Sequence, residues 1–410
     1  MEIRPIFSAL MKSRTGPLLV AVQVAISLAI LANALFIVQQ RIAVSERPSG
    51  VAAERDVGHV YVRPLRKLSH PEVLAEQRRE AAVLRGLAGV KAVAWTNQMP
   101  LSRSGSSSSV RATAEQVHES AQPSQYFVQP GFIQALGLRL VEGRDMTEAD
   151  VMESDPEKDA EAIPPGVIVT ESLGRALFPN ESRFVGRTFY FGLGGEQATR
   201  IIGVIERLQT TGAQPGEAGE QSVLEPLRIS QPGSHFAIRA EPGQIDRVLQ
   251  EAAETLRKTA PVPVRTFTRS MEVDRTNRYR NEKALAWMLI AVSALLLLVT
   301  VSGIVGMTML RVAQRRKQIG VRRALGARWR DILRYFVTEN LIITTGGIAA
   351  GLLLALGLNR LLIAYLGVPR LPLEYLAVGA VALWMLGVAA VYGPAARAAG
   401  ISPAIATRTA

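Results

Sequence analysis

The sequence predicts a membrane protein with four transmembrane helices and a bilobed α/β domain outside the membrane. Three observations predict this class: four apolar runs of bilayer-spanning length, a long polar stretch between the first two runs, and a short loop crowded with basic residues. Hydrophobic residues make up 48% of the 410 residues, although 20% are charged. Such a composition fits a chain that lies partly in the membrane and partly in water.

The four apolar runs cover residues 17–38, 284–310, 337–358 and 374–393. Each is close to the ~20 residues that a helix needs to cross a bilayer. The second run contains no charged residue, which argues against a buried helix of a soluble protein. The third and fourth runs are weaker, because each has an acidic residue near one end and several glycines.

The first run has a second interpretation, a cleaved signal peptide. Arg4, Lys12 and Arg14 resemble the basic start of such a peptide, and Ala32–Ala34 resembles a cleavage site. The apolar run nevertheless continues past that site to Val38. We therefore expect an uncleaved helix, preceded by a cytoplasmic segment over residues 1–16.

Positive charge is concentrated between the second and third runs. Residues 311–334 hold nine basic side chains, namely Arg311, Arg315, Arg316, Lys317, Arg322, Arg323, Arg328, Arg330 and Arg334. Because Lys and Arg in short loops stay on the cytoplasmic side, this loop is expected inside the cell. Alternation then puts both termini inside and residues 39–283 outside, in agreement with Arg397 and Arg408 near the C-terminus.

The outer region begins and ends with the same pattern of strand, helix and strand. Its first copy comprises His59–Leu65, Pro71–Leu87 and Val90–Trp95. Its second copy comprises His235–Ala240, Gly243–Lys258 and Val262–Phe267. Two such units around a middle portion predict one α/β subdomain with a second subdomain inserted at about 115–225. Residues 271–287 are expected to continue into the second span as one long helix.

Three stretches of the outer region predict flexible, solvated loops. Ser102–Ser109 is almost entirely serine, Glu148–Pro165 is acidic, and Thr210–Gln221 is rich in glycine and polar residues. None has the apolar content that a packed segment needs.

The basic loop also carries a helical pattern. Leu325, Trp329, Ile332, Leu333 and Phe336 recur on one face of a helix, and Gly320 and Gly326 are expected to interrupt it. This predicts a short helix on the membrane surface, a break, and an amphipathic helix entering the third span. These residues alone leave two roles open for the element. It would take up a movement of a cytoplasmic partner, or it would lie on the surface of anionic lipid.

The stretch from Gln314 to Ile342 resembles the signature of FtsX-like permease domains, the membrane subunits of MacB-type ABC transporters. The matching positions are Ile319, Gly320, Arg322, Arg323, Ala324, Leu325, Gly326, Ala327 and Glu339. A closing motif of the family is matched by Gly393–Arg408, and residues 136–144 and 167–178 resemble segments of its periplasmic core domain. Gln318 departs from the family, which usually has an acidic residue there. Two consequences of Gln318 stay open. It would weaken a charge contact with the partner, or it would mark this chain as one of two unlike permeases in the assembly.

The resemblance implies an assembly in the bacterial inner membrane, with a periplasmic core domain over residues 39–283 and an FtsX-like permease domain over residues 284–410. Its partners would be an ABC ATPase dimer that holds ATP and magnesium, a second permease copy or an unlike permease, membrane lipid, and a periplasmic adaptor with an outer-membrane channel. Its function would be to couple ATP hydrolysis on the separate ATPase to motion of the periplasmic domain. Export of a periplasmic substrate is the first expectation; lipoprotein extraction and regulation of a cell-wall hydrolase are the alternatives.

The resemblance also implies where the ATPase couples to this chain. The expected coupling residues are Gly320, Arg322, Arg323, Ala324, Leu325, Gly326, Ala327, Trp329, Asp331 and Ile332. Arg322 and Arg323 would dock on the ATPase, while Trp329 and Leu333 would anchor the element to the other helices.

Several kinds of chemistry have no support in the sequence. There is no GxxxxGK[ST] motif for nucleotide phosphates, no HExxH motif, and no cysteine. The four histidines, His59, His70, His118 and His235, are scattered along the chain, so no metal cluster is expected. The positive charge lies beside membrane spans, so nucleic acid is not an expected partner. We therefore expect a non-catalytic subunit that binds no cofactor; a membrane-anchored sensor would need a larger cytoplasmic domain.

Polar and small residues within the spans predict packing rather than proton transfer. Glu339 and Arg360 lie near the ends of the third span, where they are expected to snorkel or cap. Ser302 with Gly306, and Gly347 with Gly351, have the spacing that favours close helix packing.

Overall fold

The computed structural model describes residues 15–155, 158, 162–192, 197–366 and 369–400. The contacts divide the chain into two units, one over residues 1–45 and 281–410 and the other over residues 46–280. Arg4, Lys12, Arg14 and Arg408, which entered the topology prediction, lie outside the described residues.

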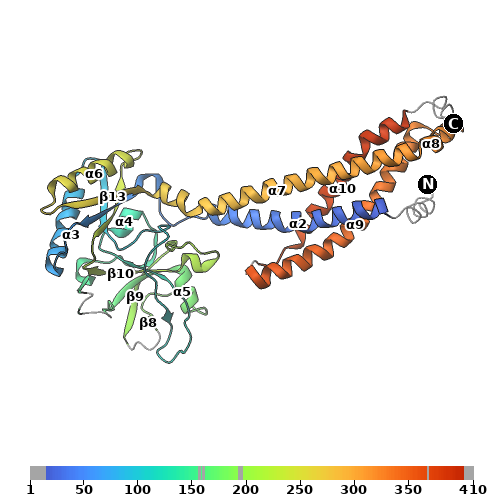
Figure 1. Cartoon of the computed structure of the whole chain (residues 1–410). Helices are drawn as coiled ribbons and strands as arrows, with labels where there is room; N and C mark the ends of the chain where they lie inside the picture. The colour runs from blue at the N-terminus through green and yellow to red at the C-terminus, as the bar shows by residue number, and fades with distance from the viewer. Residues whose placement is uncertain (1–14, 156–157, 159–161, 193–196, 367–368, 401–410) are drawn as a thin grey trace. The chain divides into compact units, whose positions relative to one another are not determined.

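Helices make up the described part of the first unit, and one of them, α7, begins within the second unit (Figure 1). They are α2 (Thr15–Glu46), α7 (Met271–Gln314), α8 (Arg316–Ala324), α9 (Trp329–Leu366) and α10 (Leu373–Ala399). Within the described residues, α2, α7, α9 and α10 are the four helices long and apolar enough to cross a membrane. Each contains one of the predicted runs, so the four predicted spans are confirmed. Helix α7 also confirms the predicted continuous helix, because it begins at Met271 and has no break before Gln314.

Glycines allow α9 to approach α2 closely. A Cβ atom on Gly347 would lie 2.7 Å from the Ala21 carbonyl oxygen, and one on Gly351 would lie 2.9 Å from the Ala25 oxygen. The predicted packing role of this pair is therefore confirmed. Gly306 differs, because no atom lies within 4 Å of a Cβ built there.

Helices α2 and α7 differ in how much of their apolar surface is covered within the chain. In the most apolar 18-residue window, 56% of the α2 residues are buried against 17% of those of α7. Helix α2 is also held by polar contacts: Ser27 Oγ lies 2.7 Å from Thr300 Oγ1 of α7, and Asn33 donates to the Ala355 carbonyl of α9 at 3.2 Å. Most of α7 in the spanning region therefore faces outward from its unit.

The second unit contains three β-sheets within its described residues, and the four-stranded sheet follows the predicted strand–helix–strand copies. Its elements are β1 (Val57–Pro64), α3 (His70–Arg85), β2 (Val90–Trp95), β12 (Ser234–Ala240), α6 (Ile245–Thr259) and β13 (Val264–Ser270). The strand order β13-β1-β12-β2, antiparallel throughout, is that of a ferredoxin-like split βαβ fold. Helices α3 and α6 pack on the sheet through Leu84, Val248 and Leu256, which are fully buried.

Local sequence explains where α3 begins. The Ser69 backbone N–H and hydroxyl both bind the Glu72 carboxylate at 2.8 Å, and a proline follows His70 in the first turn. A capping box with an early proline is a strong start signal for a helix.

A second sheet takes its strands from the middle of the outer region. Its elements and the short segments around them are β3 (Val110–Arg111), β4 (Ser124–Phe127), α4 (Phe132–Leu136), β5 (Leu140–Gly143), β7 (Gly166–Thr170), α5 (Glu171–Leu177), β8 (Thr188–Phe191), β9 (Ala198–Ile205) and β10 (Ser222–Glu225). The strands run in the order β3-β8-β9-β7-β10-β4, with β5 paired to β9. A two-stranded sheet joins β6 (Met152–Ser154) to β11 (Leu227–Ile229), and short 3-10 turns lie at η1 (Glu54–Asp56), η2 (Glu148–Asp150) and η3 (Glu217–Glu220). The α/β character of the outer region is confirmed; its subdomain boundaries at about 115 and 225 stay a prediction.

The prediction of a solvated tip at Thr210–Gln221 is wrong at the ends of the segment, whereas residues 214–218 are exposed as expected. Thr210, Thr211 and Ala213 are buried, and the Thr210 N–H donates to the Gly219 carbonyl at 2.9 Å. Composition misled here because these small polar residues satisfy their hydrogen bonds inside the unit. Ser102–Ser109 is a loop, yet the Ser106 N–H donates to Gln98 Oε1 at 2.5 Å. Part of Glu148–Pro165 lies outside the described residues.

Candidate functional site

The predicted coupling element consists of α8, a turn at Gly326, and the start of α9. The predicted break at Gly326 is confirmed: this residue has φ +94°, and the Ala327 N–H donates to the Arg322 carbonyl at 3.0 Å. A left-handed residue just after a helix satisfies its last carbonyls, and glycine adopts that conformation at little cost. The predicted break at Gly320 is wrong, because Gly320 lies inside α8 and is buried.

Asp331 fixes the start of α9. Its Oδ2 accepts a hydrogen bond from the Arg328 N–H at 2.9 Å. A carboxylate in the first turn also interacts favourably with the helix dipole. The short connection between α8 and α9 is therefore ordered by a glycine at one end and an aspartate at the other.

The apolar side chains of this element point to two different environments. Ile319, Ile332 and Phe336 are buried in the core of the helical unit, and Leu333 packs against it. In contrast, Leu325 is 84% exposed, Val321 47% and Trp329 38%. The prediction that Leu325 lies on one helical face with Trp329, Ile332, Leu333 and Phe336 is therefore wrong, because Leu325 precedes α9. Helix α9 begins at Trp329, so the helical spacing does not extend back to Leu325.

The remaining predicted coupling residues lie around this exposed apolar surface. Arg322, Ala324, Gly326 and Asp331 are exposed, whereas Arg323 and Ala327 are half-buried. Arg322 has its guanidinium carbon 5.3 Å from the centre of the Tyr335 ring. Arg323 donates to the Ala399 carbonyl of α10 at 2.8 Å. Both arginines thus have contacts within the chain, while Val321 and Leu325 present an uncovered apolar surface, here called the α8 tip.

A buried ion pair connects α7 to α9 behind the α8 tip. Arg311 Nη1 lies 2.8 Å from Glu339 Oε1, and Arg315 Nη1 lies 3.6 Å from the same oxygen. Glu339 is 2% exposed, so the expectation that it snorkels or caps is wrong. This pair could have been predicted from the opposite charges of Arg311 and Glu339 at the ends of two apolar helices. Ionisable residues in such helices usually pair with one another.

Tyr335 completes this connection. It accepts a hydrogen bond from Arg315 and lies under the guanidinium groups of Arg315 and Arg322. Arg315 is the last residue before α8, so its contacts hold the α7–α8 junction against α9. Any displacement of α8 must therefore strain contacts with both neighbouring helices.

The other end of α7 is held by polar contacts inside the second unit. Arg275 donates to Glu54 through Nε and Nη2, at 2.7 and 2.6 Å. The Tyr279 hydroxyl donates to Gln209 Oε1 at 3.1 Å, and Arg278 donates to the Gly212 carbonyl. These contacts could not be predicted from the sequence, because each joins residues far apart in the chain.

A histidine pair extends this anchor into the four-stranded sheet. His59 Nε2 lies 2.7 Å from Asp274 Oδ2 in the first turn of α7, and His235 Nε2 lies 2.7 Å from His59 Nδ1. Arg269 binds the other oxygen of Asp274 at 3.0 Å. His59 and His235, which are far apart in the sequence, thus lie together on neighbouring strands. Burial, and next the neighbouring His59, lower the pKa of His235 to about 3, so this ring is neutral near pH 7.

Comparisons with known proteins agree with this architecture. The family described as MacB-like periplasmic core domain matches residues 21–258, more than half of the chain. The chain belongs to this family. The family described as FtsX-like permease C-terminal matches residues 290–403, which include α8 and the glycine turn. The protein is therefore a MacB-like permease, a multi-pass membrane protein with a periplasmic core domain, and the resemblance seen in the sequence is confirmed.

The curated relatives are distant, and they are longer than this chain. The pyoverdine export ATP-binding/permease protein PvdT of Pseudomonas syringae pv. syringae (strain B728a) is 29% identical over 240 residues, covering 55% of this chain and 33% of PvdT. The macrolide export ATP-binding/permease protein MacB of Agrobacterium fabrum (strain C58 / ATCC 33970) is 25% identical over 290 residues, covering 69% of this chain and 42% of that protein. The chain thus spans well under half the length of these relatives.

A solved structure of the periplasmic region of MacB from Actinobacillus actinomycetemcomitans is also similar. It is 16% identical, with a TM-score of 0.34, and the match covers 57% of this chain and 96% of that one. A likeness at this level adds no argument about function.

Proposed function

We propose that this MacB-like permease couples ATP hydrolysis on a separate ABC ATPase to movement of its periplasmic core domain. The α8 tip would receive the ATPase, and α7 would carry the displacement. The observation that supports this proposal most is the two-sided character of α8: Ile319 is packed into the helical core, while Leu325 is 84% exposed.

An exposed leucine between arginines is suited to a protein partner. A cleft on the partner would bury Leu325 and Val321, and acidic side chains at its rim would face Arg322. A coupling element also has to be fixed to what it moves. The Arg315–Tyr335 and Arg311–Glu339 contacts supply that fixation on one side, and Arg275–Glu54 supplies it at the start of α7.

The proposal includes the topology, the partners and the cargo. The α8 tip and both termini would lie in the cytoplasm of a bacterial cell, with residues 39–283 in the periplasm. Two ATPases would act on two permeases, with an adaptor and an outer-membrane channel completing the route. Export of a periplasmic substrate is favoured, because the relatives reported above are described as export proteins.

The first test places the photo-crosslinking amino acid p-benzoylphenylalanine at Leu325 of the full chain in its native membranes. We expect a crosslinked protein whose sequence contains GxxxxGK[ST], the phosphate-binding motif of an ATPase. The control position is Leu373, which is 74% exposed at the start of α10 and is not part of the α8 tip. Crosslinks to lipid alone at Leu325, or the same ATPase captured from both positions, would contradict the proposal.

The second test reverses charge on α8. Arg322→Glu with Arg323→Glu is expected to abolish co-purification of the ATPase while the chain still inserts in the membrane. The matched control is Arg330→Glu with Arg334→Glu, because both arginines are exposed at the start of α9 and the change in charge is equal. Equal loss in the two variants would indicate attraction of charge in general rather than docking on α8.

A further inference from the structure

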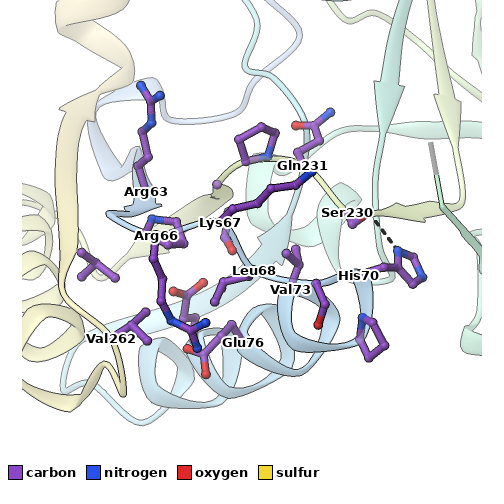
Figure 2. A pocket seen from close by; sticks show the side chains of 18 of the residues that line it. Arg63, Arg66, Lys67, Leu68, His70, Val73, Glu76, Ser230, Gln231 and Val262 are labelled. Carbon is purple, nitrogen blue, oxygen red and sulfur yellow. Dashed lines mark hydrogen bonds between the residues drawn. The ribbon is translucent and has the colours of Figure 1, made fainter. Parts of the chain in front are cut away.

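A pocket lies beside the four-stranded sheet of the periplasmic core. Its residues are distant in sequence from the coupling element. It has a volume of about 800 Å³, within the range of ligand sites in proteins. Its walls come from the β1–α3 connection, the first turns of α3, the segment before β12, and the start of β13 (Figure 2). Figure 2 shows Lys67 extending towards Gln231 across the pocket, and His70 bonded to Ser230.

Apolar side chains form a substantial part of the lining. Leu68 and Val73 contribute from the α3 side, and Val262 and Val264 from the β13 side. Leu65, which also lines the pocket, is 61% exposed. These residues would cover an apolar ligand body and become less exposed to water in doing so.

The rim of the pocket carries positive charge from Arg63, Arg66 and Lys67. Two acidic lining residues have basic partners of their own, since Glu76 pairs with Arg79 at 2.7 Å and Asp155 with Lys158 at 3.6 Å. Arg63 lines the pocket and is paired in register with Arg265 on the neighbouring antiparallel strand. Like charges directly opposite one another destabilise a sheet. Arg66, also on the rim, binds Glu72 at 3.2 Å, but both side chains are about half exposed, so that pair is weak. An anion beside Arg63 would offset the repulsion that the sheet itself creates.

The acidic group at the inner side of the pocket does little to cancel this charge. Glu80 is 3% exposed, and one of its carboxyl oxygens has no hydrogen-bond partner. Burial raises the pKa of Glu80 to about 7, so a large fraction of this side chain is uncharged at neutral pH. The pocket is therefore apolar inside and cationic at its rim.

We propose that this pocket binds an amphiphilic anion, with an apolar body between α3 and the start of β13 and a carboxylate or phosphate at the cationic rim, which includes Arg63 and Arg66 (Figure 2). A cation would be repelled by the rim, and a neutral apolar molecule would leave the arginines uncompensated. The proposal concerns binding in the periplasmic core alone, and it does not depend on the coupling role of α8.

The probe is 4-(4-fluorophenyl)butanoate, titrated against the full chain in non-ionic maltoside micelles and followed by fluorine NMR. Protein-free micelles give the partition of the probe into detergent. We expect saturable binding of the carboxylate, and binding at least tenfold weaker for the isosteric neutral compound 4-(4-fluorophenyl)butanamide. Absence of saturable binding by the carboxylate, or equal binding of the two compounds, would overturn the proposal.

Variants then locate the site. Arg63→Ala with Arg66→Ala is expected to weaken carboxylate binding at least tenfold without lowering thermal stability, because it removes the repulsion from Arg265. Arg55→Ala with Arg183→Ala is the matched control, since both are exposed arginines of the same unit that do not line the pocket. Val262→Trp, which narrows the apolar part of the pocket, is expected to weaken binding at least tenfold with the rim charges intact. Unchanged affinity in the Arg63 and Arg66 variant, or in Val262→Trp, would refute this location.

Discussion

The two ends of α7 are held by different chemistry. At the Met271 end, half-buried and buried polar groups make several directional hydrogen bonds to sheet and loop residues, as Arg275 does with Glu54. At the Gln314 end, a single carboxylate, Glu339, holds Arg311 inside a helical bundle. Between these ends, only 17% of the residues of the most apolar window are buried. A helix fixed at its ends and largely uncovered between them is suited to transmit displacement along its length.

The comparison predicts that removing one partner of an ion pair lowers stability more at the Gln314 end of α7 than at the Met271 end. Glu339→Leu leaves the Arg311 charge buried without its partner, which is expected to cost about 3–5 kcal/mol of stability. Arg311→Met with Glu339→Leu should recover most of this loss, because the more buried of the two arginines at Glu339 is removed as well. Thermal unfolding of the full chain in micelles measures both variants. If the double variant is as unstable as the single one, the ion pair is not what connects these helices.

The Met271 end should respond to pH instead. The pKa of His235 is lowered in the folded protein, so the unfolded chain binds a proton at a pH where the folded chain does not. The stability from the neutral ring is present above about pH 6.5 and is lost as the pH falls towards 3, by up to about 1.4 kcal/mol per pH unit. His59, Asp274, Arg269 and Tyr61 are the charged or titratable groups around this ring.

The measurement is the midpoint of thermal unfolding of the periplasmic core between pH 7 and pH 4. His235→Phe is expected to flatten this profile, because phenylalanine takes up no proton. A profile of His235→Phe as steep as that of the wild type would mean that other groups cause the loss of stability in acid.

A single contact at the Met271 end should matter less than the ion pair at the other end, since several others remain. Arg275→Met is expected to cost about 1.5–3 kcal/mol, the range for a hydrogen bond to a charged group. The pairing of Arg275 with Glu54 raises the pKa of the arginine, in accord with a favourable contact. The double variant Arg275→Met with Glu54→Gln should lose little more than Arg275→Met alone. Additive losses would show that the two side chains act independently.

The smallest expected effect is at the glycine turn. Gly326→Ala forces alanine into a left-handed conformation, with an expected cost of about 1–2 kcal/mol. Gly306→Ala is the control: this glycine lies inside α7 with open space around it, so alanine should be neutral or stabilising. Equal destabilisation by both substitutions would argue against a special backbone conformation at residue 326.

The sequence was sufficient where structure follows from local pattern. Apolar length predicted the four spans, and the run of strand, helix and strand predicted α3 and α6 within a few residues of their bounds. Gly326 was predicted as a break because a left-handed residue after a helix favours glycine. These features depend on neighbours within one or two turns of the chain.

The sequence was insufficient where a contact joins distant residues. His59 and Asp274 are 215 positions apart, and no periodicity relates them. Leu325 matches the helical spacing of Trp329 in the sequence, yet the Gly326 turn places the two residues in different elements. The pocket beside Arg63 could not be foreseen either, since it depends on strand register between β1 and β13.

The most direct test of the proposed coupling asks whether α7 transmits movement from the ATPase to the periplasmic core through contacts at both of its ends. The chain has no cysteine, so Val117→Cys, at a position 78% exposed on the periplasmic core, can carry a spin label in both permeases of the reconstituted assembly. We predict that the distance between the labels changes on ATP binding, and that Arg275→Met reduces this change while ATP hydrolysis continues. If the distance between the labels does not change in the wild type, or if it changes equally in Arg275→Met, the proposed role of α7 is contradicted.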